Sequence, residues 1–157
     1  MTTIEHSRRR DGRRPGTPGR FSRWMQQRAN SRLVAKIRRG RGTFMGMDVL
    51  ILHTVGRRSG APRLTPLAWF DDGAGDRLVV ASGGGALHPD WYLNLMAASD
   101  GAAIELPGAE PVPVGAQLLS GDAREQAWRR VVAAQPRIAR YQAKSDREYP
   151  LVRLVSG

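Results

Sequence analysis

The sequence predicts a mainly β protein with appended helices, an α+β fold built around a small barrel. Short apolar runs separated by turn signals fill residues 49–81 and 102–119, a pattern typical of antiparallel hairpins. Helix-like segments lie near the start and in the second half of the chain. Because they do not alternate strictly with the strands, a parallel sheet is not expected. The 157 residues, 41% of them hydrophobic, suit one domain with a real core.

Composition excludes several kinds of site. Cysteine is absent, which excludes disulfides, thiolate metal sites and cysteine nucleophiles and indicates a reducing cytoplasm. No apolar run reaches eighteen residues, so no transmembrane helix is expected. The three histidines, His6, His53 and His88, lie far apart in the sequence, and a metal site is therefore not predicted.

The net charge of +11 is carried by the first 42 residues. They hold 13 Arg and Lys against two acids, whereas the remaining residues are neutral overall. Residues 1–20 are rich in Arg, Gly and Pro and are predicted to be a disordered basic leader. A neutral body argues against nucleic acid as the main partner.

Residues 21–42 are predicted to form an amphipathic basic helix segment. Its apolar residues fall on shared helical faces, and Asn30-Ser31 is expected to interrupt it. Such a segment packs on its own domain, lies on an anionic membrane surface, or, least expected, acts as a nucleic-acid arm. The apolar residues concerned are Phe21, Trp24, Met25, Leu33, Val34 and Ile37.

Residues 43–157 are predicted to form the folded domain. Pro66 indicates an edge strand or a bulge. Asp122 is the expected N-cap of a helix that runs to the break at Pro136, with Glu125 completing a capping box. Strands are expected at residues 49–52, 62–70, 77–81, 102–106, 112–119 and 149–155, and further helices at 91–98 and 138–143.

Residues 81–95 join a strand to a helix through three consecutive glycines. Backbone N–H groups of a glycine loop at a helix start can approach an anionic group closely. The alternative is a flexible surface loop between two ordinary elements.

A second loop, residues 56–63, concentrates positive charge. Arg57, Arg58 and Arg63 can hold phosphate or carboxylate groups through bidentate hydrogen bonds, and Ser59 adds a hydroxyl donor. The alternative is a solvated turn whose charges serve solubility.

The helix after the glycine loop offers flat side chains. Trp91 and Tyr92 can line a planar ring or belong to the core, and Asn94 can cap or bind. The sequence contains no nucleophile elbow, no Walker A loop and no compelling acid–base pair. If the protein is an enzyme, a bound cofactor is therefore expected to carry the reaction.

Three motifs together resemble the deazaflavin-dependent nitroreductase family. Residues 56–67 resemble its TGRKSGxPRxxPL run, residues 81–95 its ASKGG…PxWYxNL run, and residues 141–152 its YQxxTDRxIPVV run. The match extends over residues 43–155, so the resemblance implies that the folded domain, residues 43–157, is a split-barrel cofactor-binding domain. It implies a split β-barrel and an oxidoreductase that uses the reduced 8-hydroxy-5-deazaflavin coenzyme F420 as hydride donor. Members of the family reduce quinones and some nitro compounds, and membrane association is known among them.

The resemblance also implies which residues form the site. Those at the phosphate and acidic tail of the coenzyme would be Arg57, Arg58, Ser59 and Arg63. Those along its path would be Thr65, Pro66, Leu67, Ala81, Ser82, Gly83 and Gly84. Those on the adjacent helix wall would be Trp91, Tyr92 and Asn94.

This sequence departs from the family pattern at two places. The lysine usual after the motif serine is Gly83, and the tyrosines usual before the third motif fall at Gln135 and Ile138, so that only Tyr141 remains. The second departure bears on nitro reduction more than on coenzyme binding. Tyr141 is the candidate catalytic residue, since its phenol can assist protonation at neutral pH.

The expected function is hydride transfer from reduced F420 to a quinone-like or other electron-poor acceptor. A non-catalytic barrel that binds a lipid or a flavin-type ligand is the alternative. The expected location is the cytoplasm, with residues 1–42 as a candidate tether to the inner face of the cell membrane. The sequence indicates no oligomeric state.

Overall fold

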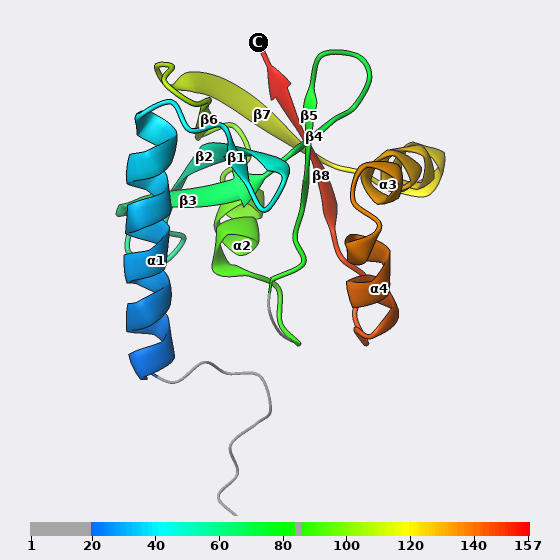
Figure 1. The fold of residues 1–157 in the computed structure, drawn as a ribbon, viewed down its shortest axis with the longest axis horizontal. Helices are drawn as coiled ribbons and strands as arrows, with labels where there is room; N and C mark the ends of the chain where they lie inside the picture. The colour runs from blue at the N-terminus through cyan, green and yellow to red at the C-terminus, as the bar shows by residue number, and fades with distance from the viewer. Residues whose placement is uncertain (1–19, 84–85) are drawn as a thin grey trace, which may run out of the picture.

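A computed structural model describes residues 20–83 and 86–157, and in this part of the chain the predicted mainly β class is confirmed. One antiparallel sheet curls into a half-barrel, and four helices lie around it (Figure 1). The strands are β1 Thr43–Phe44, β2 Met47–Val55, β3 Pro62–Ala68, β4 Phe70–Asp71, β5 Arg77–Val80, β6 Ala102–Glu105, β7 Val112–Leu118 and β8 Leu151–Ser156. The helices are α1 Arg20–Arg38, α2 Asp90–Ala97, α3 Gly121–Ala134 and α4 Arg137–Ala143.

The sheet runs in the order β1-β2-β6-β7-β8-β5-β4, and β3 pairs with β2. Among the described strands β3 pairs only with β2, which confirms the edge position that Pro66 predicts. The expected strand at residues 62–70 is divided at Trp69 into β3 and β4, because β4 leaves β2 and pairs with β5.

Residues 49–52 of strand β2 are all apolar because both faces of the strand are covered there. Leu50 and Leu52 belong to the core cluster inside the barrel, with Leu95 of α2 among its members. Val49 and Ile51 face the other way and pack with α1. A strand buried on both faces loses the usual alternation of apolar and polar residues.

Helix α1 is continuous, so the break expected at Asn30-Ser31 is wrong. The Ser31 hydroxyl donates a hydrogen bond of 2.9 Å to the carbonyl of Gln27, one turn earlier, and the helix passes through it. Val34 and Ile37 are buried against β2, which confirms that this face packs on the domain. Figure 1 shows α1 standing beside β3, with α3 and α4 on the other side of the molecule.

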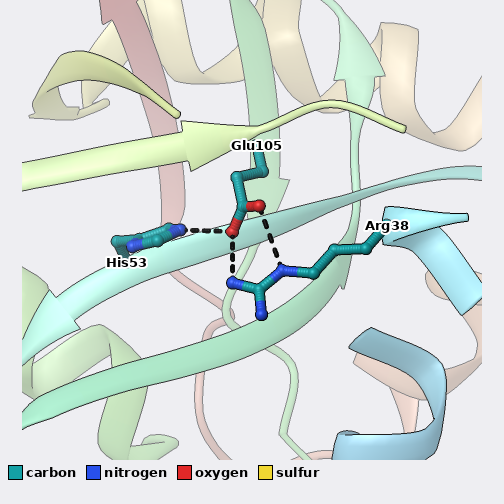
Figure 2. A network of polar contacts seen from close by, with 3 residues as sticks. All are labelled: Arg38, His53 and Glu105. Carbon is teal, nitrogen blue, oxygen red and sulfur yellow. Dashed lines mark hydrogen bonds and ion pairs between the residues drawn. The ribbon is translucent and has the colours of Figure 1, made fainter. Parts of the chain in front are cut away.

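A charged cluster fastens the end of α1 to the sheet (Figure 2). Arg38 donates from Nε and Nη2 to the two carboxylate oxygens of Glu105 on β6, at 3.1 and 3.0 Å. His53 Nε2 lies 2.5 Å from Oε2 of the same carboxylate. The hydrogen bond from Arg38 lowers the pKa of Glu105 from its ordinary value, against the effect of burial.

Two helix and strand ends differ from the sequence prediction. The N-cap of α3 is Ser120, so the assignment of Asp122 is wrong, and Glu125 forms an ion pair with Arg129 at 2.6 Å instead of closing a capping box. The last strand begins at Leu151 instead of residue 149, because the amide of Tyr149 donates to Gln142 of α4 at 2.7 Å.

Candidate functional site

A groove of about 980 Å³ lies between α1, the β1–β3 region, α4 and the turn that follows α4. That volume falls at the upper end of the range usual for small-molecule sites, roughly 300–1,000 Å³. The walls are mostly apolar, and Lys144, Asp146 and Arg147 bring charge to one side. The apolar lining includes Leu33, Phe44, Val49, Val80, Trp91 and Ile138.

Six of the residues predicted for the site line this groove although they are far apart in the sequence. They come from β3, the glycine loop, α2 and α4, which the fold brings around one space. The six are Pro66, Leu67, Ser82, Gly83, Trp91 and Tyr141.

Other predicted residues lie elsewhere. Ala81 is fully buried and Tyr92 is 8% exposed, and both belong to the core cluster. Thr65 lies on β3 opposite Leu52 and is not part of the groove lining. Gly84 lies outside the described residues.

The arginine turn after β2 is built by its own backbone. The amide of Gly56 donates to the carbonyl of Ala61 and the amide of Gly60 donates back to Gly56, both at 2.8 Å. The Ser59 hydroxyl oxygen accepts the amide of Ala61 at 3.2 Å. Gly60 has φ +71°, a conformation that favours glycine.

Helix α2 holds Arg57 in place. The Asn94 side-chain oxygen accepts the Arg57 amide at 3.1 Å and its Nη1 at 2.8 Å, while Nη2 contacts Asp90 at 3.2 Å. Asn94 is only 6% exposed, so its part in this structure is to orient Arg57. Arg58 and Arg63 are exposed and form no ion pair within the described residues.

The arginine turn and the groove are joined by two elements. Strand β3 carries Arg63 and, four residues later on the same face, Leu67 in the groove wall, a separation of roughly 13 Å along a strand. Helix α2 carries Asn94, which holds Arg57, and Trp91, which lines the groove. A ligand with a flat ring and an anionic tail could therefore contact both.

Gly83 occupies a position that suits glycine. Its φ is +49°, and a Cβ there would lie 3.2 Å from Cδ of Pro89. A lysine at this position would be strained, which gives the departure from the family pattern a physical reason.

Sequence reasoning missed Arg147 as a site residue. Its guanidinium donates to the carbonyl oxygens of Ala81, at 2.9 Å, and of Ser82, and it lies over the ring of Tyr149 at 5.0 Å. The Asp146-Arg147 pair in the third motif was the available signal. The cluster around Glu105 was also missed, although a lone acid in an apolar strand marks it.

Residues 20–83 and 86–157 contain no group of three or more His, Asp or Glu arranged to hold a metal ion. Within the same residues no helix is both long enough and apolar enough to span a bilayer.

The family model and the relatives that match this chain point to the same family. Residues 20–155 match the model of the family described as F420H(2)-dependent quinone reductase. A Mycobacterium tuberculosis protein with that name is 33% identical over 89 residues, which are 51% of this chain and 60% of that protein. The chain therefore spans about 60% of the length of several curated relatives that it matches.

Two further similarities cover a larger share of the protein that is compared. A second Mycobacterium tuberculosis protein, provisionally given the same name, is 30% identical over 74% of this chain and 96% of its own length. The solved structure of an F420-H2 dependent reductase, FDR-A, is 33% identical, with a TM-score of 0.59 over 68% of this chain and 92% of that one.

Proposed function

Because the chain belongs to the F420H(2)-dependent quinone reductase family, we propose that it is a reductase that uses reduced coenzyme F420 to reduce a quinone-like acceptor. The observation that carries the proposal is that strand β3 and helix α2 each carry one residue of the arginine turn or its support and one residue of the apolar groove wall. A deazaflavin coenzyme has a flat ring and an anionic tail, and these two surfaces match its two ends.

The residues present fit the coenzyme in chemistry. Arg57, Arg58 and Arg63 would hold the phosphate and carboxylate groups of its tail, with Arg57 already oriented by Asn94. Pro66, Leu67, Ser82, Gly83 and Trp91 would line the ring. When bound, the reduced coenzyme supplies a hydride to the acceptor.

The protein's own contribution is binding, orientation and exclusion of water. The apolar side chains of Leu33, Phe44 and Ile138 would pack against an acceptor and displace water from the groove. Tyr141 lies in the groove lining and is 54% exposed. Its phenol would donate a hydrogen bond or a proton to the acceptor oxygen.

We also propose that the basic N-terminal segment, residues 1–42, binds anionic membrane surfaces. Helix α1 exposes Arg32 and Lys36 together with the apolar Met25, which is 54% exposed. Basic charge near exposed apolar side chains favours the interface of an anionic bilayer. Co-sedimentation with vesicles containing anionic lipid, lost on deletion of the segment, is the expected result; a wild-type protein that ignores such vesicles would contradict it.

Turnover is tested by following the loss of reduced F420 absorbance with a water-soluble quinone as acceptor. The wild-type protein should oxidise the coenzyme in a quinone-dependent manner. The double variant Arg57→Ala/Arg58→Ala should be slowed chiefly through coenzyme binding, and Arg137→Ala, an exposed arginine on α4, serves as matched control. Absence of quinone-dependent oxidation by the wild type would overturn the proposal.

A further inference from the structure

The turn between α4 and β8 places one arginine against the glycine loop. Arg147 donates from Nη1 to the carbonyl of Ala81 and from Nη2 to the carbonyl of Ser82, so one guanidinium holds two consecutive peptide oxygens. Nη1 also lies 3.2 Å from Nδ1 of His88. The planar fork of an arginine suits two such acceptors at once, whereas the single ammonium of a lysine does not.

The turn itself is well supported. The amide of Arg147 donates to the Ser145 hydroxyl at 3.3 Å, and its carbonyl accepts from Gln142 of α4 at 2.9 Å. Tyr149 underlies the guanidinium and donates its hydroxyl to the carbonyl of Tyr141 at 3.1 Å. Arg147 therefore connects the helix that carries Tyr141 to the loop on the other side of the groove.

Two carbonyls held in this way fix the direction of two amides. In a trans peptide the C=O and the following N–H point in opposite directions, and the described residues contain no cis peptide bond. The N–H groups of Ser82 and Gly83 are therefore turned away from Arg147. Neither amide has a hydrogen-bond acceptor within the described part of the chain, and both residues line the groove.

We propose that Arg147 is a positioning residue that holds the Ser82 and Gly83 amides as a pair of donors for one ligand oxygen in the groove. The oxygen is of the carbonyl or enolate kind, such as a ring carbonyl of the coenzyme or of a quinone, so the proposal rests on the proposed function for the nature of the ligand. Successive N–H groups beside a residue with positive φ, here Gly83, form a common anion-binding concavity.

The lack of a carboxylate partner for Arg147 supports a role other than ion pairing. It forms no ion pair with any carboxylate among the residues that the structure describes. Its Nε is buried and has no partner there, an arrangement that costs free energy. A guanidinium that serves only stability would be expected to find a carboxylate.

The first test uses the free protein. In Arg147→Gln, the NMR carbonyl-carbon shifts of Ala81 and Ser82 should move away from their wild-type values. Arg147→Lys keeps the positive charge but not the two-donor fork of arginine, so it should restore these shifts only in part. The exposed Arg140 on α4 supplies the matched control, Arg140→Gln, which should leave both shifts unchanged. Unchanged shifts in a folded Arg147→Gln would overturn the proposal.

The second test adds oxidised F420 and follows amide hydrogen exchange. In the wild type, the ligand should slow exchange at the Ser82 and Gly83 amides. In Arg147→Gln and Arg147→Lys that protection should be lost and Kd should rise about tenfold or more, the expected effect of losing two hydrogen bonds. The control Arg140→Gln should keep the wild-type protection of both amides and the wild-type Kd.

The outcomes separate the two proposals. If the wild type binds no F420, the proposed function fails, and the carbonyl shifts of the free protein still decide the role of Arg147. If the wild type binds F420 without slowing exchange at these amides, or if Arg147→Gln keeps the protection and binds within twofold, the donor pair is refuted while the proposed function stands.

Discussion

Replacing Glu105 by Gln tests the charged cluster that fastens helix α1 to the sheet. The change keeps the shape of the side chain and removes the charge that accepts two hydrogen bonds from Arg38 and one contact from His53. Hydrogen bonds to charged groups contribute roughly 1.5–3 kcal/mol where solvent is excluded. Because the Arg38 side chain is 49% exposed, solvent screening reduces the expected loss to about 1–2 kcal/mol.

Calorimetry at neutral pH should then show Tm lowered by about 2–8 °C, since 1 kcal/mol shifts Tm by roughly 2–4 °C in a domain of this size. Glu110→Gln, at an exposed position, is the matched control and should leave Tm unchanged. A Glu105→Gln variant as stable as the wild type would refute the reasoning that the cluster stabilises the fold.

The same cluster has a defined pH dependence. The pKa of Glu105 is lowered in the folded protein by the hydrogen bond from Arg38. The contribution of Glu105 to the free energy of unfolding is therefore fully present at pH values above the ordinary pKa of a carboxyl group. It is lost as the pH falls through the lowered pKa. The stability difference between wild type and Glu105→Gln should therefore be constant near neutrality and shrink in acid.

Three other substitutions give separate expectations. Ile37→Ala removes a fully buried side chain between α1 and β2 and should cost about 2–5 kcal/mol in urea unfolding; a loss below 1 kcal/mol would show that α1 packs loosely. Gly83→Lys places a side chain at φ +49° against Pro89 and should lower stability by about 1–2 kcal/mol; an unchanged Tm would argue against that backbone conformation. Tyr141→Phe should lower the rate of quinone-dependent turnover by about tenfold or more and leave coenzyme Kd within twofold; unchanged turnover would remove Tyr141 from the reaction.

Local patterns predicted most of the fold because each depends on neighbouring residues. The hairpin at residues 71–75 is an example: the Asp72 carboxylate accepts the amides of Ala74 and Asp76, so the turn is encoded where it occurs. Pro66 likewise marks an edge strand by lacking a donor. The helix break at Asn30-Ser31 failed because a serine hydroxyl can bond to a carbonyl one turn earlier and leave the helix intact.

The site was less predictable because its geometry depends on distant pairings. Asn94 was expected at the ligand, yet the fold places Arg57 against it and uses the amide as a support. Arg147 reaches Ala81 across 66 positions in the sequence, and no local pattern encodes such a contact. Glu105 lies 67 positions from Arg38, and only the sheet and α1 together make that pair.

Titration with oxidised F420 tests the central claim most directly. Intrinsic or coenzyme fluorescence should be quenched on binding to micromolar wild-type protein, with flavin mononucleotide bound more weakly. Arg57→Ala/Arg58→Ala should weaken F420 binding by about tenfold or more, because charged hydrogen bonds to the tail are lost. No binding of F420 by the wild type, or equal binding by the double variant, would contradict the assignment of the arginine turn and the groove to this coenzyme.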